Sequence, residues 1–358
     1  MFLFFILGFS LQSCKKEKSL EEYKPTPYII TIPNFFPTQL NIPSDNPMTV
    51  EGIKLGRYLF YEGRLAGRDH PDSLMSCSTC HIQSHSFENG TGYGYGVTGI
   101  KTPHVMLPFI NLAFNSNGYL WNGSVYMQNP IANKQNLEDI IWMAITAPHE
   151  MFSDTNRAKE MLQNIPMYPP LFKNAFGSEI ITIKNAGRAI AQFLRTLISA
   201  NSKFDKYLRG EENLTPSEMN GYVIFNTEKG DCFHCHGTIL FTTNLFYNNA
   251  KDTVFTDTRD RYHVTFVSKD IGAYKATTLR NIELTGPYMH DGRFTTLQQV
   301  IDFYSEGLKW SPYVHPLMKK VNDGGVQLTA QQKQDLIAFL KTLTDNTFIN
   351  NPDFANPF

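Results

Sequence analysis

The feature that most constrains this chain is a short pattern of cysteine and histidine that occurs twice. SCSTCH occupies positions 76–81 and DCFHCH occupies positions 231–236, so four of the five cysteines lie in two copies of Cys-x-x-Cys-His. In a chain with this content of cysteine and histidine, chance would give roughly 0.002 such motifs. The two copies are therefore not an accident of composition.

Cys-x-x-Cys-His is the attachment pattern of a c-type haem. Two thiols at this spacing form thioether bonds to the two vinyl groups at one edge of a porphyrin, and the adjacent histidine ligates the iron through Nε2. A thioredoxin-like redox pair would need no following histidine, and a zinc site would leave both histidines without a role. We therefore expect two covalent haems. The residues that hold them are Cys77, Cys80, His81, Cys232, Cys235 and His236.

The chain begins with an apolar run, MFLFFILGFSLQSC, that ends in a cysteine. The run is too short to span a bilayer but has the length of the apolar part of a signal peptide. LQSC resembles a bacterial lipobox, so residues 1–14 are predicted to be a signal peptide with Cys14 lipidated; a plain secretory signal is the alternative. Residues 15–46 are predicted to be a tether. The protein would then be exported, periplasmic and anchored to a membrane surface as a lipoprotein.

The composition fits a folded protein with a large core. The chain has 358 residues, of which 42% are hydrophobic, and this length suits two domains. The formal net charge of −1 gives no electrostatic basis for binding nucleic acid.

Four helices are predicted from periodicity and capping. Residues 185–204 carry apolar side chains at helical spacing. The segments that open at Thr215, Thr296 and Thr329 each have Glu or Gln three residues later, which is the signature of a capping box. Strand signals are sparse and long loops intervene. The predicted fold is therefore mostly α-helical with long loops.

An internal repeat indicates two domains. NLAFNSNGYLWNGS (111–124) resembles NIELTGPYMHDGR (281–293), and each stretch follows one Cys-x-x-Cys-His motif. The simplest explanation is duplication of a single-haem unit, which gives two cytochrome-c-like haem domains. We place these domains at residues 47–208 and 209–350.

The sequence resembles the bacterial di-haem cytochrome c peroxidases and their relative MauG over about residues 47–345. The stretches that carry the resemblance appear in the family's order and include CSTCH, LWNG, LEDIIWMAITAPHEM, CFHCH, TLRNIELTGPYMHDGRFTTLQQVIDFY and LTAQQKQDLIAFLKTLTD. The resemblance implies an enzyme that reduces hydrogen peroxide at an N-terminal, peroxidatic haem and relays electrons through a C-terminal haem. A small cytochrome or another redox protein would donate the electrons, and a homodimer is compatible with the family.

The resemblance also implies roles for individual residues. Trp121 matches the tryptophan between the two haems, and Glu150 matches the glutamate that moves a proton during peroxide cleavage. His104 matches a loop histidine that blocks the peroxidatic iron in the resting state, with His85 as the alternative. For each of these residues, a packed or solvated side chain with no catalytic role is the alternative. The family's calcium ion between the domains would be held by Asn111, Thr285 and Pro287.

Tyr304 and Ile140 depart from the electron-transferring peroxidases. Tyr304 occupies the place of their methionine ligand to the second haem, where MauG has tyrosine. Phenolate oxygen favours ferric and higher states of iron, whereas thioether sulfur favours the ferrous state. We expect Tyr304 to be the sixth ligand, with Met289 and Met318 as alternatives. Ile140 replaces a glutamine that hydrogen-bonds near the bound oxidant. MauG-like oxidation of a protein or another substrate, or non-catalytic electron transfer, are the alternative functions.

Overall fold

The computed structural model describes residues 23–67, 74–115, 117–124 and 137–358, so the predicted signal peptide with Cys14 lies outside the described residues. The α-helices are α1 (Val50–Phe60), α2 (Cys77–Cys80), α3 (Leu137–Thr146), α4 (Thr155–Asn164), α5 (Tyr168–Phe176), α6 (Ile183–Arg195), α7 (Lys203–Leu208), α8 (Pro216–Phe225), α9 (Phe233–His236), α10 (Tyr262–Thr265), α11 (Leu297–Glu306), α12 (Ala330–Lys341) and α13 (Asn346–Ile349). The strands are β1 (Tyr93–Tyr95), β2 (Lys101–Val105), β3 (Phe246–Tyr247) and β4 (Tyr274–Lys275). The 3-10 helices include η4 (Leu112–Phe114) and η6 (Ile282–Leu284).

The predicted fold class is confirmed in its main feature, because the chain is mostly helical. The strands form two short antiparallel pairs, β1 with β2 and β3 with β4. Thr215, Thr296 and Thr329 each cap a helix through the predicted capping box. Within the described part of the chain, no helix is both long and apolar enough to cross a membrane.

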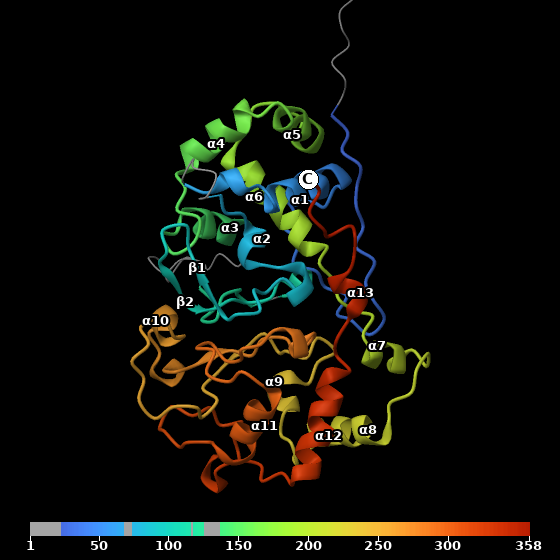
Figure 1. Cartoon of the computed structure of the whole chain (residues 1–358), viewed down its shortest axis with the longest axis vertical. Helices are drawn as coiled ribbons and strands as arrows, with labels where there is room; N and C mark the ends of the chain where they lie inside the picture. The colour runs from blue at the N-terminus through green and yellow to red at the C-terminus, as the bar shows by residue number, and fades with distance from the viewer. Residues whose placement is uncertain (1–22, 68–73, 116, 125–136) are drawn as a thin grey trace, which may run out of the picture.

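The molecule has an upper half built from α1 to α6 and a lower half built from α8 to α12 (Figure 1). Each half contains a pair of helices in close contact, α1 with α6 and α8 with α12. A Cβ atom at Gly56 would lie 1.9 Å from the carbonyl oxygen of Ala189, and one at Gly221 would lie 1.9 Å from that of Asp335. No side chain fits at either crossing, so each half depends on a close backbone contact of the same kind.

The internal sequence repeat is also repeated in the backbone. Asn111 and Asn281 have positive φ angles of 56° and 59°, and each begins a 3-10 helix, η4 or η6. Asparagine tolerates this left-handed conformation better than most residues. The amide oxygen of Asn111 accepts a hydrogen bond from the Ser199 N–H at 3.0 Å, and that of Asn281 accepts one from the Asp345 N–H at 2.7 Å. Each asparagine therefore fastens the segment that follows the last long helix of a half, α6 or α12.

The described part of the predicted tether packs against both halves. Residues 23–46 run along the side of the molecule (dark blue in Figure 1). Ile30 and Phe36 are buried in a cluster with Phe114 of the upper half and Leu240 of the lower half. The Arg280 guanidinium lies 4.7 Å from the centre of the Phe36 ring. The buried side chains of Ile30 and Phe36 therefore hold this otherwise largely exposed segment against both halves.

The two halves exchange segments near the predicted domain boundary. Phe204 of α7 packs in the core of the lower half, although the prediction assigns it to the N-terminal domain. Its neighbour Asp205 forms two hydrogen bonds of 2.9 Å with Arg280. After α12 the chain returns upward (Figure 1), and Phe348 and Phe354 complete the core of the upper half.

We expect Asp205→Asn to lower the free energy of unfolding by about 3–5 kcal/mol, because the Arg280 guanidinium would stay buried without its counter-charge. Arg280 is 0% exposed and Asp205 is 5% exposed. Urea denaturation measures the change. Glu211→Gln breaks the exposed pair with Arg209 and is the matched control, with an expected loss below about 1 kcal/mol. Equal losses in the two variants would contradict the importance of the buried pair.

Candidate haem cavities and active site

The first Cys-x-x-Cys-His motif lines a largely apolar cavity in the upper half. The motif forms the short helix α2, and the cavity has a volume of about 160 Å³. Cys77, Cys80, His81 and Glu150 are among its lining residues. The second motif, on α9, lines a similar cavity of about 220 Å³ in the lower half, with Cys232, Cys235 and His236 in its wall.

Both motif histidines are held in the same way. Nδ1 of His81 lies 2.7 Å from the carbonyl oxygen of Phe87, and Nδ1 of His236 lies 2.8 Å from that of Phe241. Phe87 and Phe241 have positive φ angles of 60° and 52°, which are uncommon for bulky residues. An Nδ1–H bonded to a carbonyl leaves Nε2 with the lone pair that a metal needs. Burial lowers the pKa of His81 to about 4, so this imidazole is neutral.

The motif cysteines fit haem attachment better than the two alternatives. Neither pair forms a disulfide. Burial raises the pKa of Cys77 and of Cys232 to about 12, whereas a reactive redox pair has a lowered thiol pKa. A four-cysteine zinc site would require the pairs to meet, but each pair lines a different cavity. An apolar cavity with two thiols and a neutral histidine at one wall suits a covalently bound haem.

The two cavities share one wall, and Trp121 is fastened to it. Its indole N–H donates to the carbonyl oxygen of Val105 at 2.9 Å, and its own carbonyl oxygen accepts from the Lys275 N–H at 2.7 Å. The indole lines the second cavity beside this wall. The residues that line both cavities are Met106, Leu107, Pro108, Lys275, Thr277 and Thr278.

Glu150 is a partly buried acid that lines the first cavity. Burial raises the pKa of its carboxyl group to about 7. The loop between β1 and β2 closes on its backbone, because the Val97 N–H donates to the Glu150 carbonyl oxygen at 2.8 Å. A Cβ atom at Gly96 would lie 2.4 Å from the carbonyl carbon of His149, so this approach requires glycine. Ile140 lines the same cavity, where it offers no hydrogen bond.

Known proteins are similar to this chain over most of their length. The family model described as di-haem cytochrome c peroxidase matches residues 50–213. MauG of Methylorubrum extorquens is 32% identical over 309 residues, which cover 86% of this chain and 82% of MauG. Cytochrome c551 peroxidase of Nitrosomonas europaea is 32% identical over 327 residues, 87% of this chain and 84% of that protein. The crystal structure of a MauG-like protein associated with microbial copper homeostasis superimposes with a TM-score of 0.82 and 31% identity, over 92% of this chain and 99% of that one.

This chain belongs to the di-haem cytochrome c peroxidase family. Membership makes it an oxidoreductase of the peroxidase type and implies two c-type haems. The resemblance inferred from the sequence motifs is therefore confirmed.

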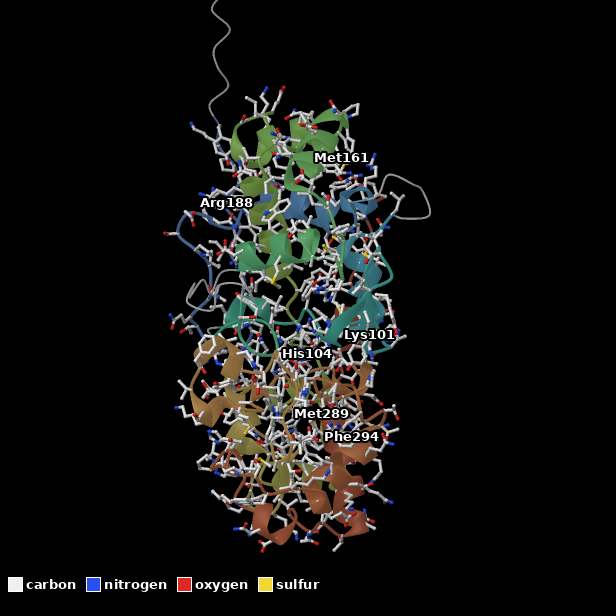
Figure 2. All side chains as sticks on the ribbon, turned by 90° about the vertical axis from the view of Figure 1, so that its left-hand side faces the viewer. Lys101, His104, Met161, Arg188, Met289 and Phe294 are labelled. Carbon is white, nitrogen blue, oxygen red and sulfur yellow. The ribbon has the colours of Figure 1, made fainter. Side chains whose placement is uncertain are left out.

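His104 does not occupy the place predicted for it in this peroxidase. It lies on β2 at the waist of the molecule (Figure 2), and its Nε2 is 2.7 Å from a carboxylate oxygen of Asp257. Among the described residues that line the first cavity, neither His104 nor His85 occurs. The bond to Asp257 directs the His104 imidazole toward the lower half and away from the first cavity.

All three predicted candidates for the sixth ligand line the second cavity, namely Tyr304, Met289 and Met318. The Tyr304 hydroxyl accepts a hydrogen bond from the side-chain amide of Asn249 at 3.1 Å, and the same amide lies 3.6 Å from the Met289 sulfur. Burial raises the pKa of Tyr304, so the free phenol is neutral and a metal would have to displace its proton.

The calcium site stays a prediction, and its expected ligands are divided between the two cavities. Thr285 and Pro287 line the second cavity, whereas Asn111 lines the first. The Asn111 amide bonds to the Ser199 backbone at both ends: its N–H group donates to the Ser199 carbonyl oxygen at 3.2 Å, and its oxygen accepts from the Ser199 N–H at 3.0 Å. Asn111 thus has the same fastening role as its counterpart Asn281.

A cluster of side chains beside Trp121 was not predicted from the sequence. The His290 ring lies 6.4 Å from the indole, edge to face, and stacks on the Tyr274 ring at 3.5 Å. The Tyr274 hydroxyl donates to Asp257 at 2.6 Å. The internal repeat contained a signal for part of this cluster, because LWNG aligns with MHDG and therefore Trp121 with His290. The contact with Asp257 had no such signal.

We expect the protein, made with cytochrome c maturation machinery, to carry two covalent haems per chain. Replacing both Cys77 and Cys80 by alanine removes one thioether-bound haem, and replacing Cys232 and Cys235 removes the other. The haemochrome absorbance and the mass of the denatured chain measure the number. Cys14→Ser, which lies outside both motifs, is the control and keeps two haems. A wild-type chain with fewer than two would contradict the assignment.

Proposed function

We propose that the protein is an exported di-haem peroxidase that reduces hydrogen peroxide to water with electrons relayed through the second haem. Each peroxide takes up two electrons and two protons and yields two water molecules. The observation that carries the proposal is Glu150, an acid with a pKa of about 7 in the same cavity as His81. Peroxide cleavage requires a group that can accept and return a proton near neutral pH.

Haem bound at the two motifs would supply the electrons that cleave the O–O bond, and the chain supplies the proton transfer. Glu150 takes the proton from one peroxide oxygen and returns it to the other, which leaves as water. Raised by burial, its pKa suits both steps because neither the acid nor the base form is scarce near pH 7. Since Ile140 cannot compete for the peroxide, Glu150 is the acid–base group of this cavity.

Trp121 is proposed to carry electrons across the shared wall. The side chains that line both cavities are aliphatic or saturated, and an indole loses an electron far more readily than these groups. Its two hydrogen bonds, to Val105 and Lys275, hold it against both segments that form the wall. The order of residues then gives an N-terminal peroxidatic domain at 47–208 and a C-terminal electron-transferring domain at 209–350.

We also propose that a lipid on Cys14 holds the protein at a membrane surface in the periplasm and that a small cytochrome or similar redox protein donates electrons. The support is the apolar run that ends in LQSC and the sequence similarity to cytochrome-named peroxidases.

We expect Glu150→Gln to slow the reaction with peroxide by about 10²–10⁴-fold, because glutamine cannot exchange the proton. Stopped-flow mixing of the reduced and half-reduced holoprotein with peroxide measures the rate. Glu88→Gln is the matched control, since burial also raises the pKa of Glu88 to about 7, but this residue lies outside the residues that line the cavity. Equal fast rates in wild type and Glu150→Gln would assign the proton transfer to another group, and the absence of a fast reaction in both proteins would favour a non-catalytic electron carrier.

The same rate should rise with pH between about pH 6 and pH 8. The first step needs the ionised carboxylate, and a pKa raised to about 7 keeps Glu150 protonated below that pH. The increase approaches about tenfold per pH unit below the pKa and levels off above it. In Glu150→Gln the remaining rate should not change over this range; an identical pH profile in both proteins would assign the titration to another group.

The alternative function is MauG-like oxidation of a protein or another substrate, and Tyr304 in the second cavity favours it. We expect Tyr304→Met to raise the potential of the second haem by on the order of 100 mV, because thioether replaces phenolate. Met289→Leu and Met318→Leu are the controls and should leave the potential and the visible spectrum unchanged. If one of these controls alters the spectrum and Tyr304→Phe does not, that methionine is the ligand.

A further inference from the structure

Tyr274 lies at the end of a row of aromatic rings that begins at Trp121. Its ring stacks on that of His290 with centres 3.5 Å apart and planes 11° apart. The His290 ring in turn meets the Trp121 indole at 6.4 Å. Trp121, His290 and Tyr274 all line the second cavity. The row therefore connects the shared wall between the cavities with Tyr274 through direct ring contacts.

The hydroxyl of Tyr274 is bonded to a carboxylate. It donates to Oδ2 of Asp257 at 2.6 Å, and Nε2 of His104 lies 2.7 Å from the same oxygen. Burial works against ionisation of Asp257, but the hydrogen bonds from His104 and Tyr274 outweigh it and hold its pKa well below the usual range. Burial, reinforced by Asp257, raises the pKa of Tyr274. A neutral phenol thus faces an ionised carboxylate.

This pairing matters because a phenol that loses an electron becomes a very strong acid and must release its proton at once. Four tyrosines line the second cavity. Tyr288 donates to the backbone carbonyl oxygen of Ile282, which cannot take up a proton, and Tyr247 pairs with the hydroxyl of Thr243. Tyr304 accepts a hydrogen bond from an amide. Among these four, Tyr274 alone has a base as its partner.

We propose that Tyr274 is a redox-active tyrosine that stores one oxidising equivalent during the reaction with peroxide. The proposal rests on the peroxidase function above. Tyr274 gives up one electron through His290 and Trp121, which supplies one of the two electrons that the peroxide requires. Its O–H bond breaks and the proton moves to Oδ2 of Asp257. An electron from the external donor then restores the phenol, and Asp257 returns the proton. The Asp257 side chain is 33% exposed, so solvent can exchange this proton.

The test is electron paramagnetic resonance of the holoprotein, frozen rapidly after mixing with one equivalent of hydrogen peroxide. Protein made with ring-deuterated tyrosine should give a narrower radical signal than unlabelled protein. Tyr274→Phe should abolish the tyrosyl signal at unchanged haem content, and Tyr288→Phe should retain it. Asp257→Asn cannot accept the proton, so it should lower the radical yield at least tenfold while the Tyr274 ring stays in place.

Peroxide consumption is measured in the same samples, which separates the two proposals. If peroxide is consumed but no deuterium-sensitive signal forms, or if the signal survives in Tyr274→Phe, the role of Tyr274 is overturned and the peroxidase function stands. If the signal is lost in Tyr274→Phe but unchanged in Asp257→Asn, the carboxylate is not the proton acceptor and the proposal is overturned in this form. If wild-type protein consumes no peroxide, both proposals fall.

Discussion

The wall shared by the two cavities is the constraint on which the rest of the structure depends. Each half surrounds an apolar space of about 160 or 220 Å³ that its own side chains do not fill. A covalently held haem would occupy each space and complete the core around it. Because the same residues line both cavities, haems bound in the two cavities would be neighbours. Electrons that move between the haems would have to cross this wall.

Duplication explains how one architecture provides two different sites. The helix crossings at Gly56 and Gly221 are alike, and so are the carbonyl groups of Phe87 and Phe241 that hold the two histidines. What differs is the lining of each cavity. Glu150 and Ile140 line the first, whereas Tyr304, Met289 and Met318 line the second. In the proposed mechanism, these differences divide the chemistry between the two sites.

Local sequence signals predicted part of this structure, and the failures have physical causes. The capping boxes were correct because their hydrogen bonds join residues three apart. The helix expected over residues 185–204 ends at Arg195, since the next carbonyl groups bond to distant segments; Leu197, for example, accepts from the Asn111 N–H at 2.9 Å. Helix α1 gave no clear signal because Gly52 and Gly56 lower helix propensity by about 1 kcal/mol each, although the contact with α6 requires them.

For the site, sequence motifs identify residues that lie within one short stretch, but not pairs of residues that meet only in the folded chain. The two motifs name their own thiols and histidines, whereas His104 and Asp257 are 153 residues apart and meet only in the folded chain. In the proposed mechanism, protons and electrons use different residues. Protons move at Glu150 and Asp257, whose side chains are 28% and 33% exposed. Electrons move through the contacting rings of Trp121 and His290, which occupy equivalent positions of the two repeats. A buried ring that loses only an electron leaves a positive charge in an apolar wall, so a nearby base that takes up the ring's proton avoids the cost of that charge. At the end of this row of rings, Asp257 is the proposed base for Tyr274.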